Sequence, residues 1–83
     1  MLTLQEFRFL PFEKKCDVVT FTGNYLCYRV NGDFKLFLYD AGGFFVEVMF
    51  SKSENRVLGF NAFSELRILE PYLDMISIAE VFA

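Results

Sequence analysis

The fold is decided by residues 25–48, which read YLCYRVNGDFKLFLYDAGGFFVEV. β-Branched and aromatic residues are dense in this stretch, as is typical of strands. The Asn-Gly pair at 31–32 predicts a two-residue type I′ hairpin turn, and Ala-Gly-Gly at 41–43 predicts a three-residue turn with a glycine in the left-handed position. A polar loop follows at 51–55, so we predict an antiparallel meander of four strands. The predicted strands are 25–30, 34–39, 44–51 and 56–62.

Two helices are predicted before the strands. Thr3 followed by Glu6 is a capping-box pattern, which starts a short helix over 4–9. Pro11 fits the first turn of a second helix, and Gly23 is placed to end that helix in a left-handed cap. The apolar stripe of the second helix is formed by Phe12, Cys16 and Val19.

The tail of the chain is predicted to be helical in short pieces. Pro71 cannot sit inside a regular α-helix without losing a hydrogen bond, so we expect a break near Glu70. Ser77 and Glu80 form a second capping-box pattern in the last residues. The fold class is therefore predicted as α+β, a single domain over 1–83. Its architecture would be a two-layer sandwich, with the four-stranded antiparallel meander carrying the N-terminal and C-terminal helices on one face. The apolar residues of the tail helix are Leu66, Leu69 and Leu73.

The composition excludes several classes of protein. The 83 residues are 54% hydrophobic and include 12 Phe and 4 Tyr, which excludes intrinsic disorder. No apolar run approaches the ~18 residues of a membrane span. The net charge is −3 and the longest basic run is Lys14-Lys15, so we expect neither duplex nucleic acid nor a membrane as a partner.

Catalytic and metal chemistry find little support in the sequence. The chain has no His, which removes the commonest general base and metal ligand. Cys16 and Cys27 lack a C-x-x-C partner, so we expect free thiols in a reducing cytosol, with a single disulfide as the alternative. The start of the chain shows no signal peptide, which favours a cytoplasmic location. We predict no enzyme activity, no catalytic residue, no metal site and no cofactor.

The predicted turns fix which side chains share a face of the sheet. Val30 would oppose Asp33 and Leu38 would oppose Val46; the parity of the fourth strand stays open. One set of side chains has fewer charges and is predicted to lie under the helices: Tyr25, Cys27, Phe34, Leu36, Leu38, Val46, Val48 and Phe50. The opposite set is the predicted partner-binding face: Leu26, Tyr28, Lys35, Phe37, Tyr39, Phe45, Glu47 and Met49.

Two segments resemble a known family. Residues 43–48 read GFFVEV and residues 69–73 read LEPYL, and both resemble segments of a family of small uncharacterised bacterial proteins. Members of that family share a helix that ends at a Gly, followed by a strand, and the resemblance covers most of residues 10–76. It implies an α+β fold and no assigned activity. This chain departs from the family pattern at Phe37, where a polar residue is commoner, and at Met49, where an aromatic residue is commoner.

The predicted partner-binding face suggests the function. Its apolar side chains would expose ~400–550 Å², near the largest patch found on soluble monomers. Such a face is covered either by a partner or by the chain's own loops, helix or tail. We expect a non-enzymatic interaction module that forms a homo-oligomer, as a dimer, or binds a protein partner. The alternative is a small ligand or single-stranded nucleic acid stacked on Tyr28, Phe37 and Tyr39. Glu47 would either pair with Lys35 on the surface, or fix the register of a dimer or read a ligand group.

Overall fold

The computed structural model describes residues 2–73 and 75. Its elements are α1 (Leu4–Arg8), α2 (Phe12–Thr22), β1 (Asn24–Asn31), β2 (Phe34–Asp40), β3 (Phe45–Ser51), β4 (Arg56–Phe63) and the 3₁₀-helix η1 (Leu66–Tyr72). The strands form one antiparallel sheet in the order β1-β2-β3-β4. The predicted α+β fold with a four-stranded meander is confirmed. The capping box predicted at Ser77 and Glu80 lies outside the described residues.

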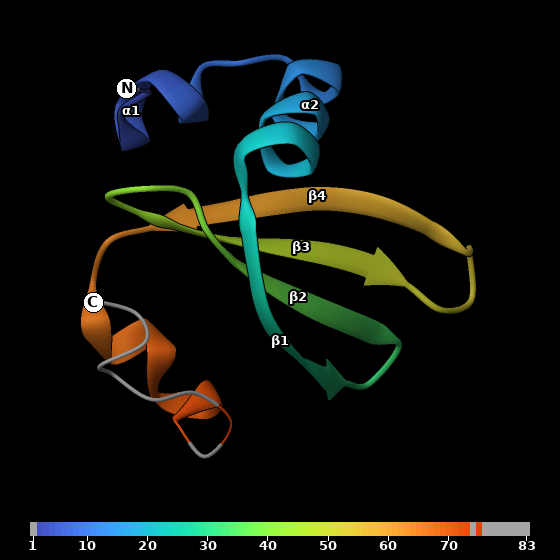
Figure 1. Cartoon of the computed structure of the whole chain (residues 1–83). Coiled ribbons are helices and arrows are strands. Elements are labelled where there is room, and N and C mark those ends of the chain that lie inside the picture. The colour runs from blue at the N-terminus through green and yellow to red at the C-terminus, as the bar shows by residue number, and fades with distance from the viewer. Residues whose placement is uncertain (1, 74, 76–83) are drawn as a thin grey trace.

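The helices cover both faces of the sheet rather than one. Figure 1 shows α1 and α2 on one side and η1 on the other. The face toward α1 and α2, the α face, carries Val46, Val48 and Ala62, which pack with the helices. The face toward η1, the η face, carries Leu38, Phe45 and Phe63, which pack with Leu69 and Tyr72. The arrangement is therefore three layers, which corrects the predicted two-layer architecture with all helices on one face.

The hairpin turn between β1 and β2 is displaced by one residue from the predicted position. Asn31 pairs with Phe34, so Gly32 and Asp33 are the turn residues. Gly32 has a φ of +61° at the first turn position and Asp33 at the second has no positive φ, which suits a type II′ turn rather than type I′. The displacement moves the β2 partners of residues 27–31 by two positions. Because side chains alternate with a period of two, the predicted faces of β2 and of residues 27–31 of β1 survive, whereas the bulge at Leu26 changes the faces of Tyr25 and Leu26.

The turn between β2 and β3 is one residue longer than predicted, and this reverses the faces of β3. Asp40 pairs with Phe45, and Leu38 pairs with Glu47 instead of Val46. A one-residue change of register sends every side chain of a strand to the opposite face. The extra turn residue, Phe44, is buried, and its ring centroid lies 5.6 Å from that of Phe7 in α1. Packing of this ring removes Phe44 from the strand.

The N-terminal helices follow the sequence signals with one exception. The capping box of α1 is confirmed: the Glu6 amide donates to Thr3 Oγ1 (3.1 Å) and the Thr3 amide donates to Glu6 Oε1 (2.9 Å). Gly23 ends α2, but with φ −74° and ψ 141°, so the predicted left-handed cap is wrong. A Cβ at Gly23 would lie 2.6 Å from the carbonyl oxygen of Val19, and this close approach accounts for the glycine.

The predicted break at Glu70 is also corrected. η1 runs from Leu66 to Tyr72 as one 3₁₀-helix that contains Pro71. None of the helices in the described part of the chain has the length and apolar character needed to cross a bilayer.

Candidate functional site

The predicted partner-binding face is divided between the two faces of the sheet. The α face carries Tyr28, Lys35, Phe37 and Tyr39, and the η face carries Leu26, Phe45, Glu47 and Met49. The reversal of β3 accounts for Phe45, Glu47 and Met49. Leu26 is the extra residue of a bulge in β1 and packs against the η-face core. The eight residues therefore do not form one surface.

The η-face members lie largely under the chain's own C-terminal helix. Phe45 and Glu47 are both buried. The Phe45 ring stacks on that of Phe63 with centroids 5.6 Å apart, and Leu69 and Tyr72 of η1 pack in the same cluster. This part of the predicted face is thus covered within the chain, and it is not a docking surface.

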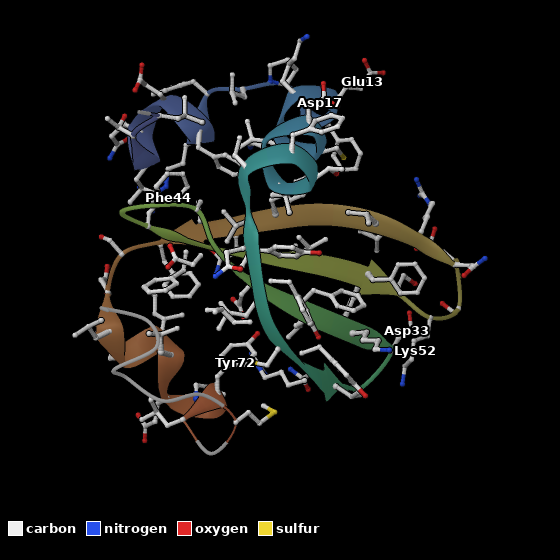
Figure 2. All side chains as sticks on the ribbon, viewed as in Figure 1. Glu13, Asp17, Asp33, Phe44, Lys52 and Tyr72 are labelled. Atoms are coloured by element: carbon white, nitrogen blue, oxygen red, sulfur yellow. The ribbon has the colours of Figure 1, made fainter. Side chains whose placement is uncertain are left out.

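Glu47 lies at the centre of a buried polar cluster. It is 6% exposed; its Oε2 accepts a 2.6 Å hydrogen bond from the Tyr72 hydroxyl, and its Oε1 accepts a 2.9 Å bond from Asn61 Nδ2. Arg29 Nη2 lies 3.6 Å from Oε2. Figure 2 shows Tyr72 projecting from η1 on the side of the sheet away from α2. The cation beside Glu47 is therefore Arg29, and Lys35, the predicted partner, lies on the opposite face.

The electrostatics of this cluster favour a structural role. Burial, together with the hydrogen bond to the Glu47 carboxylate, raises the pKa of Tyr72 above its ordinary value. The hydroxyl therefore remains protonated and continues to donate. The guanidinium of Arg29 lies 5.3 Å from the centre of the Tyr72 ring, which adds a cation–π contact. The cluster joins β3 to η1. Sequence reasoning missed Tyr72 and Asn61 as partners of Glu47, because no local pattern connects residues so far apart in the chain.

The α face retains the aromatic part of the prediction. An aromatic patch lies on the β1–β2 hairpin and the neighbouring part of β3, and it consists of Tyr25, Tyr28, Phe37, Tyr39 and Phe50. Ring centroids of neighbours lie between 5.5 Å (Tyr25 to Tyr39) and 6.4 Å (Phe37 to Phe50). These separations are those of interacting aromatic pairs. Tyr25 was predicted to lie in the core; the bulge in β1 pairs it with Tyr39 and places it in the patch instead.

Exposure of the patch is uneven. Tyr39 packs in the core under α2, whereas Tyr25 is 47% exposed and Tyr28 is 45% exposed. The ammonium of Lys35 lies 4.2 Å from the centre of the Tyr28 ring and 5.3 Å from that of Phe37. α2 therefore covers one end of the patch, and the end formed by the hairpin is open.

An open hollow follows the β1 side of the patch. It has a volume of about 510 Å³, and its lining alternates between the two faces of β1: Tyr25, Cys27, Tyr28, Arg29 and Val30, with Met75. The hollow therefore extends around the free edge of β1. Among the described residues that line it, Arg29 is the one charged side chain, and its guanidinium is directed to Glu47.

Both cysteines are free thiols in the structure. Burial raises the pKa of the Cys27 thiol, which makes it a poor nucleophile. Within the described residues, no three His, Cys, Asp or Glu side chains gather where they could hold a metal ion.

Comparison of the chain with protein-family models, with curated proteins and with solved structures finds no match. The resemblance to the small bacterial family therefore stays a prediction, and the aromatic patch is the best-supported candidate site on the molecule.

Proposed function

We propose that this chain is a non-enzymatic interaction module of the cytoplasm that forms a homodimer through the aromatic patch. The observation that carries the proposal is the exposure of Tyr25 and Tyr28, at 47% and 45%, in a continuous cluster of packed rings at the edge of the sheet. Exposed clusters of this kind, next to polar residues, mark interaction sites more often than scattered apolar residues do.

The charge of the patch favours a protein partner over nucleic acid. Single-stranded nucleic acids need a groove of several cations that follows the phosphate backbone. In the described part of the chain, Lys35 is the one cation over the patch, and its ammonium already lies against two rings. The whole chain carries a net charge of −3. A second copy of the chain offers rings and a lysine that can form the same contacts in return, as a two-fold interface requires.

The two tyrosines alone give only weak association. A fully buried aromatic side chain removes roughly 150–250 Å² from water, so two half-exposed tyrosines offer about 200 Å² per copy. Burial in a dimer would contribute roughly 10 kcal/mol, at about 25 cal/mol per Å² over both copies. Association costs about 4–15 kcal/mol in lost freedom, so more surface than the patch must be buried in a stable dimer.

Sedimentation velocity from micromolar to millimolar protein tests the proposal. The wild-type mass is expected to rise from 9.7 kDa toward twice that value as the concentration increases. Tyr28→Glu should keep the protein monomeric, because it places a charge in the patch. The fold should survive this change, since Tyr28 is half exposed and the new carboxylate can pair with Lys35. Phe9→Glu is the matched control, since Phe9 is 86% exposed on the N-terminal helical segment, away from the hairpin.

Three results would overturn the proposal. The first is a single 9.7 kDa species at every concentration. The second is an equal loss of association in Phe9→Glu and Tyr28→Glu. The third is salt-sensitive binding of a single-stranded oligonucleotide that Tyr28→Glu abolishes in a monomeric wild-type protein, which would favour nucleic-acid recognition instead.

A further inference from the structure

The two edges of the sheet differ in how they are protected. β4 carries a bulge at Leu58, where Met49 and Phe50 of β3 pair with Gly59 and Val57. The guanidinium of Arg8 in α1 donates a 3.0 Å hydrogen bond to the carbonyl oxygen of Ala62 at the same strand. Bulges and charged side chains at an edge are devices that prevent another strand from adding to a sheet. The β4 edge is thus closed.

The edge at β1 lacks such devices over residues 27–31. Its bulge lies before that segment, at Leu26, and the segment contains no proline. The one charged side chain of β1, Arg29, is directed to Glu47 at 3.6 Å and so does not guard the edge. Figure 1 shows β1 as the outermost strand on its side of the sheet; η1 contacts β1 from the η face, and no described strand pairs with its free edge. An edge of this kind is a template for another strand.

The hairpin determines which backbone groups of β1 point outward. In a two-residue hairpin the pair that flanks the turn is hydrogen-bonded, and here that pair is Asn31 with Phe34. Hydrogen-bonded and non-hydrogen-bonded pairs then alternate along the strand. Arg29 therefore turns its backbone groups toward β2, whereas Tyr28 and Val30 turn theirs away from the sheet. These are residues of the open end of the α face, so the free backbone and the exposed rings occupy the same place.

We infer that a second copy of this chain adds to the β1 edge in antiparallel orientation, through the backbone groups of Tyr28 and Val30. The inference rests on the proposed homodimer and specifies how the two copies meet. Two four-stranded sheets become one eight-stranded sheet, and the two aromatic patches become neighbours on its α face. The polar clusters around Glu47 lie on the opposite face and remain intact.

The edge adds to the area that the patch offers. The unprotected segment of β1, residues 27–31, is about 17 Å long at ~3.4 Å per residue. With a layer thickness of about 10 Å, this edge offers roughly 170 Å². Together with about 200 Å² from the tyrosine rings, each copy buries roughly 370 Å². The total of roughly 740 Å² lies below the ~1,000 Å² that a stable specific interface exceeds, so the dimer belongs to the weak, transient class of interfaces.

Hydrogen exchange of the whole chain, read residue by residue at low and high protein concentration, tests the inference. The amides of Tyr28 and Val30 are expected to exchange at least about tenfold more slowly when the dimer is populated. The amide of Arg29, which bonds to β2, should be protected at both concentrations. Val30→Pro removes an outward N–H without removing a bond to β2, so the hairpin should persist while the dimer is lost. Val30→Ala is the matched control, because it shortens the side chain but keeps the N–H.

The outcomes separate this inference from the proposed function. A dimer in which Tyr28 and Val30 exchange equally fast at both concentrations would overturn edge pairing and leave the homodimer standing. Slow exchange of both amides at every concentration would mean that the edge is covered within one chain, which also overturns edge pairing. A protein that remains monomeric throughout would overturn both proposals. Concentration-dependent protection that Val30→Pro removes and Val30→Ala retains would support the inference.

Discussion

Removal of a single hydroxyl group, in Tyr72→Phe, is expected to lower the free energy of unfolding by about 2 kcal/mol. Tyr72 is 0% exposed, and its hydroxyl donates a 2.6 Å hydrogen bond to the Glu47 carboxylate. Hydrogen bonds to charged groups contribute roughly 1.5–3 kcal/mol, and loss of one leaves a buried carboxylate with fewer donors. The substitution leaves the ring in place, so no cavity forms and the loss reports the hydrogen bond rather than packing.

This loss is large for a chain of 83 residues. Domains of this size have a stability of roughly 4–12 kcal/mol, at about 0.05–0.15 kcal/mol per residue. A loss of about 2 kcal/mol should lower the melting temperature by roughly 8–16 °C. In urea, the midpoint should fall by about 1–2 M, provided that the slope is near the lower end of the usual range.

Urea titration followed by circular dichroism measures the effect, with Tyr28→Phe as the control. Tyr28 is half exposed, so loss of its hydroxyl should change the stability by less than about 0.5 kcal/mol. In a Glu47→Gln background the acceptor is neutral, and Tyr72→Phe should then cost only about 1 kcal/mol. If Tyr72→Phe proved as neutral as Tyr28→Phe, the ring alone would hold η1 on the sheet and the importance assigned to the polar cluster would be refuted.

Three further predictions follow from the structure. The raised pKa of Tyr72 means that the folded state holds this proton more tightly than the unfolded state. The resulting stability is present below the ordinary tyrosine pKa of about 10 and should be lost as the pH rises above it. Urea midpoints measured across this pH range should therefore fall more steeply in the wild type than in Tyr72→Phe. Gly23→Ala should lower the free energy of unfolding by about 1–3 kcal/mol, because its Cβ would lie 2.6 Å from a backbone oxygen. In Gly59→Ala the nearest neighbour is the flexible end of Met49 at 3.1 Å, so a smaller decrease in melting temperature is expected. The Cys27 thiol, whose pKa is raised by burial, should react with a thiol reagent at neutral pH more slowly than it does in urea, and an equal rate in both conditions would contradict its half-buried position.

Patterns of neighbouring residues in the sequence were sufficient to predict most of the helices and strands. The capping box of Thr3 and Glu6 starts α1 as predicted, and each of the four strands lies within a few residues of its predicted range. Even the displaced turn at Gly32 left the faces of β2 and of residues 27–31 of β1 unchanged, because the partners moved by two positions. Alternation along the chain and turn chemistry carry this information, and both can be read from neighbouring residues.

The face of β3 depends on a contact that neighbouring residues do not encode. Gly42 and Gly43 both adopt positive φ, and a glycine pair of this kind allows a loop of three or four residues. The choice is made by Phe44, whose ring packs on Phe7 near the start of the chain. Burial of this aromatic ring favours the longer turn, and the resulting one-residue change of register reverses the faces of all residues in β3.

The position of Glu47 explains why one half of the predicted partner-binding face is covered and the other half is open. A buried carboxylate is stable only when donors surround it. Once the register of β3 turned Glu47 away from Lys35, that side of the sheet needed a cover with a donor, and η1 brings the hydroxyl of Tyr72 to it. The α face needs no such cover, because its charged residue, Lys35, keeps its ammonium at the surface against the Tyr28 ring. The same one-residue shift that buries the carboxylate thus confines the exposed rings to the hairpin, beside the edge of β1 where a second chain can pair.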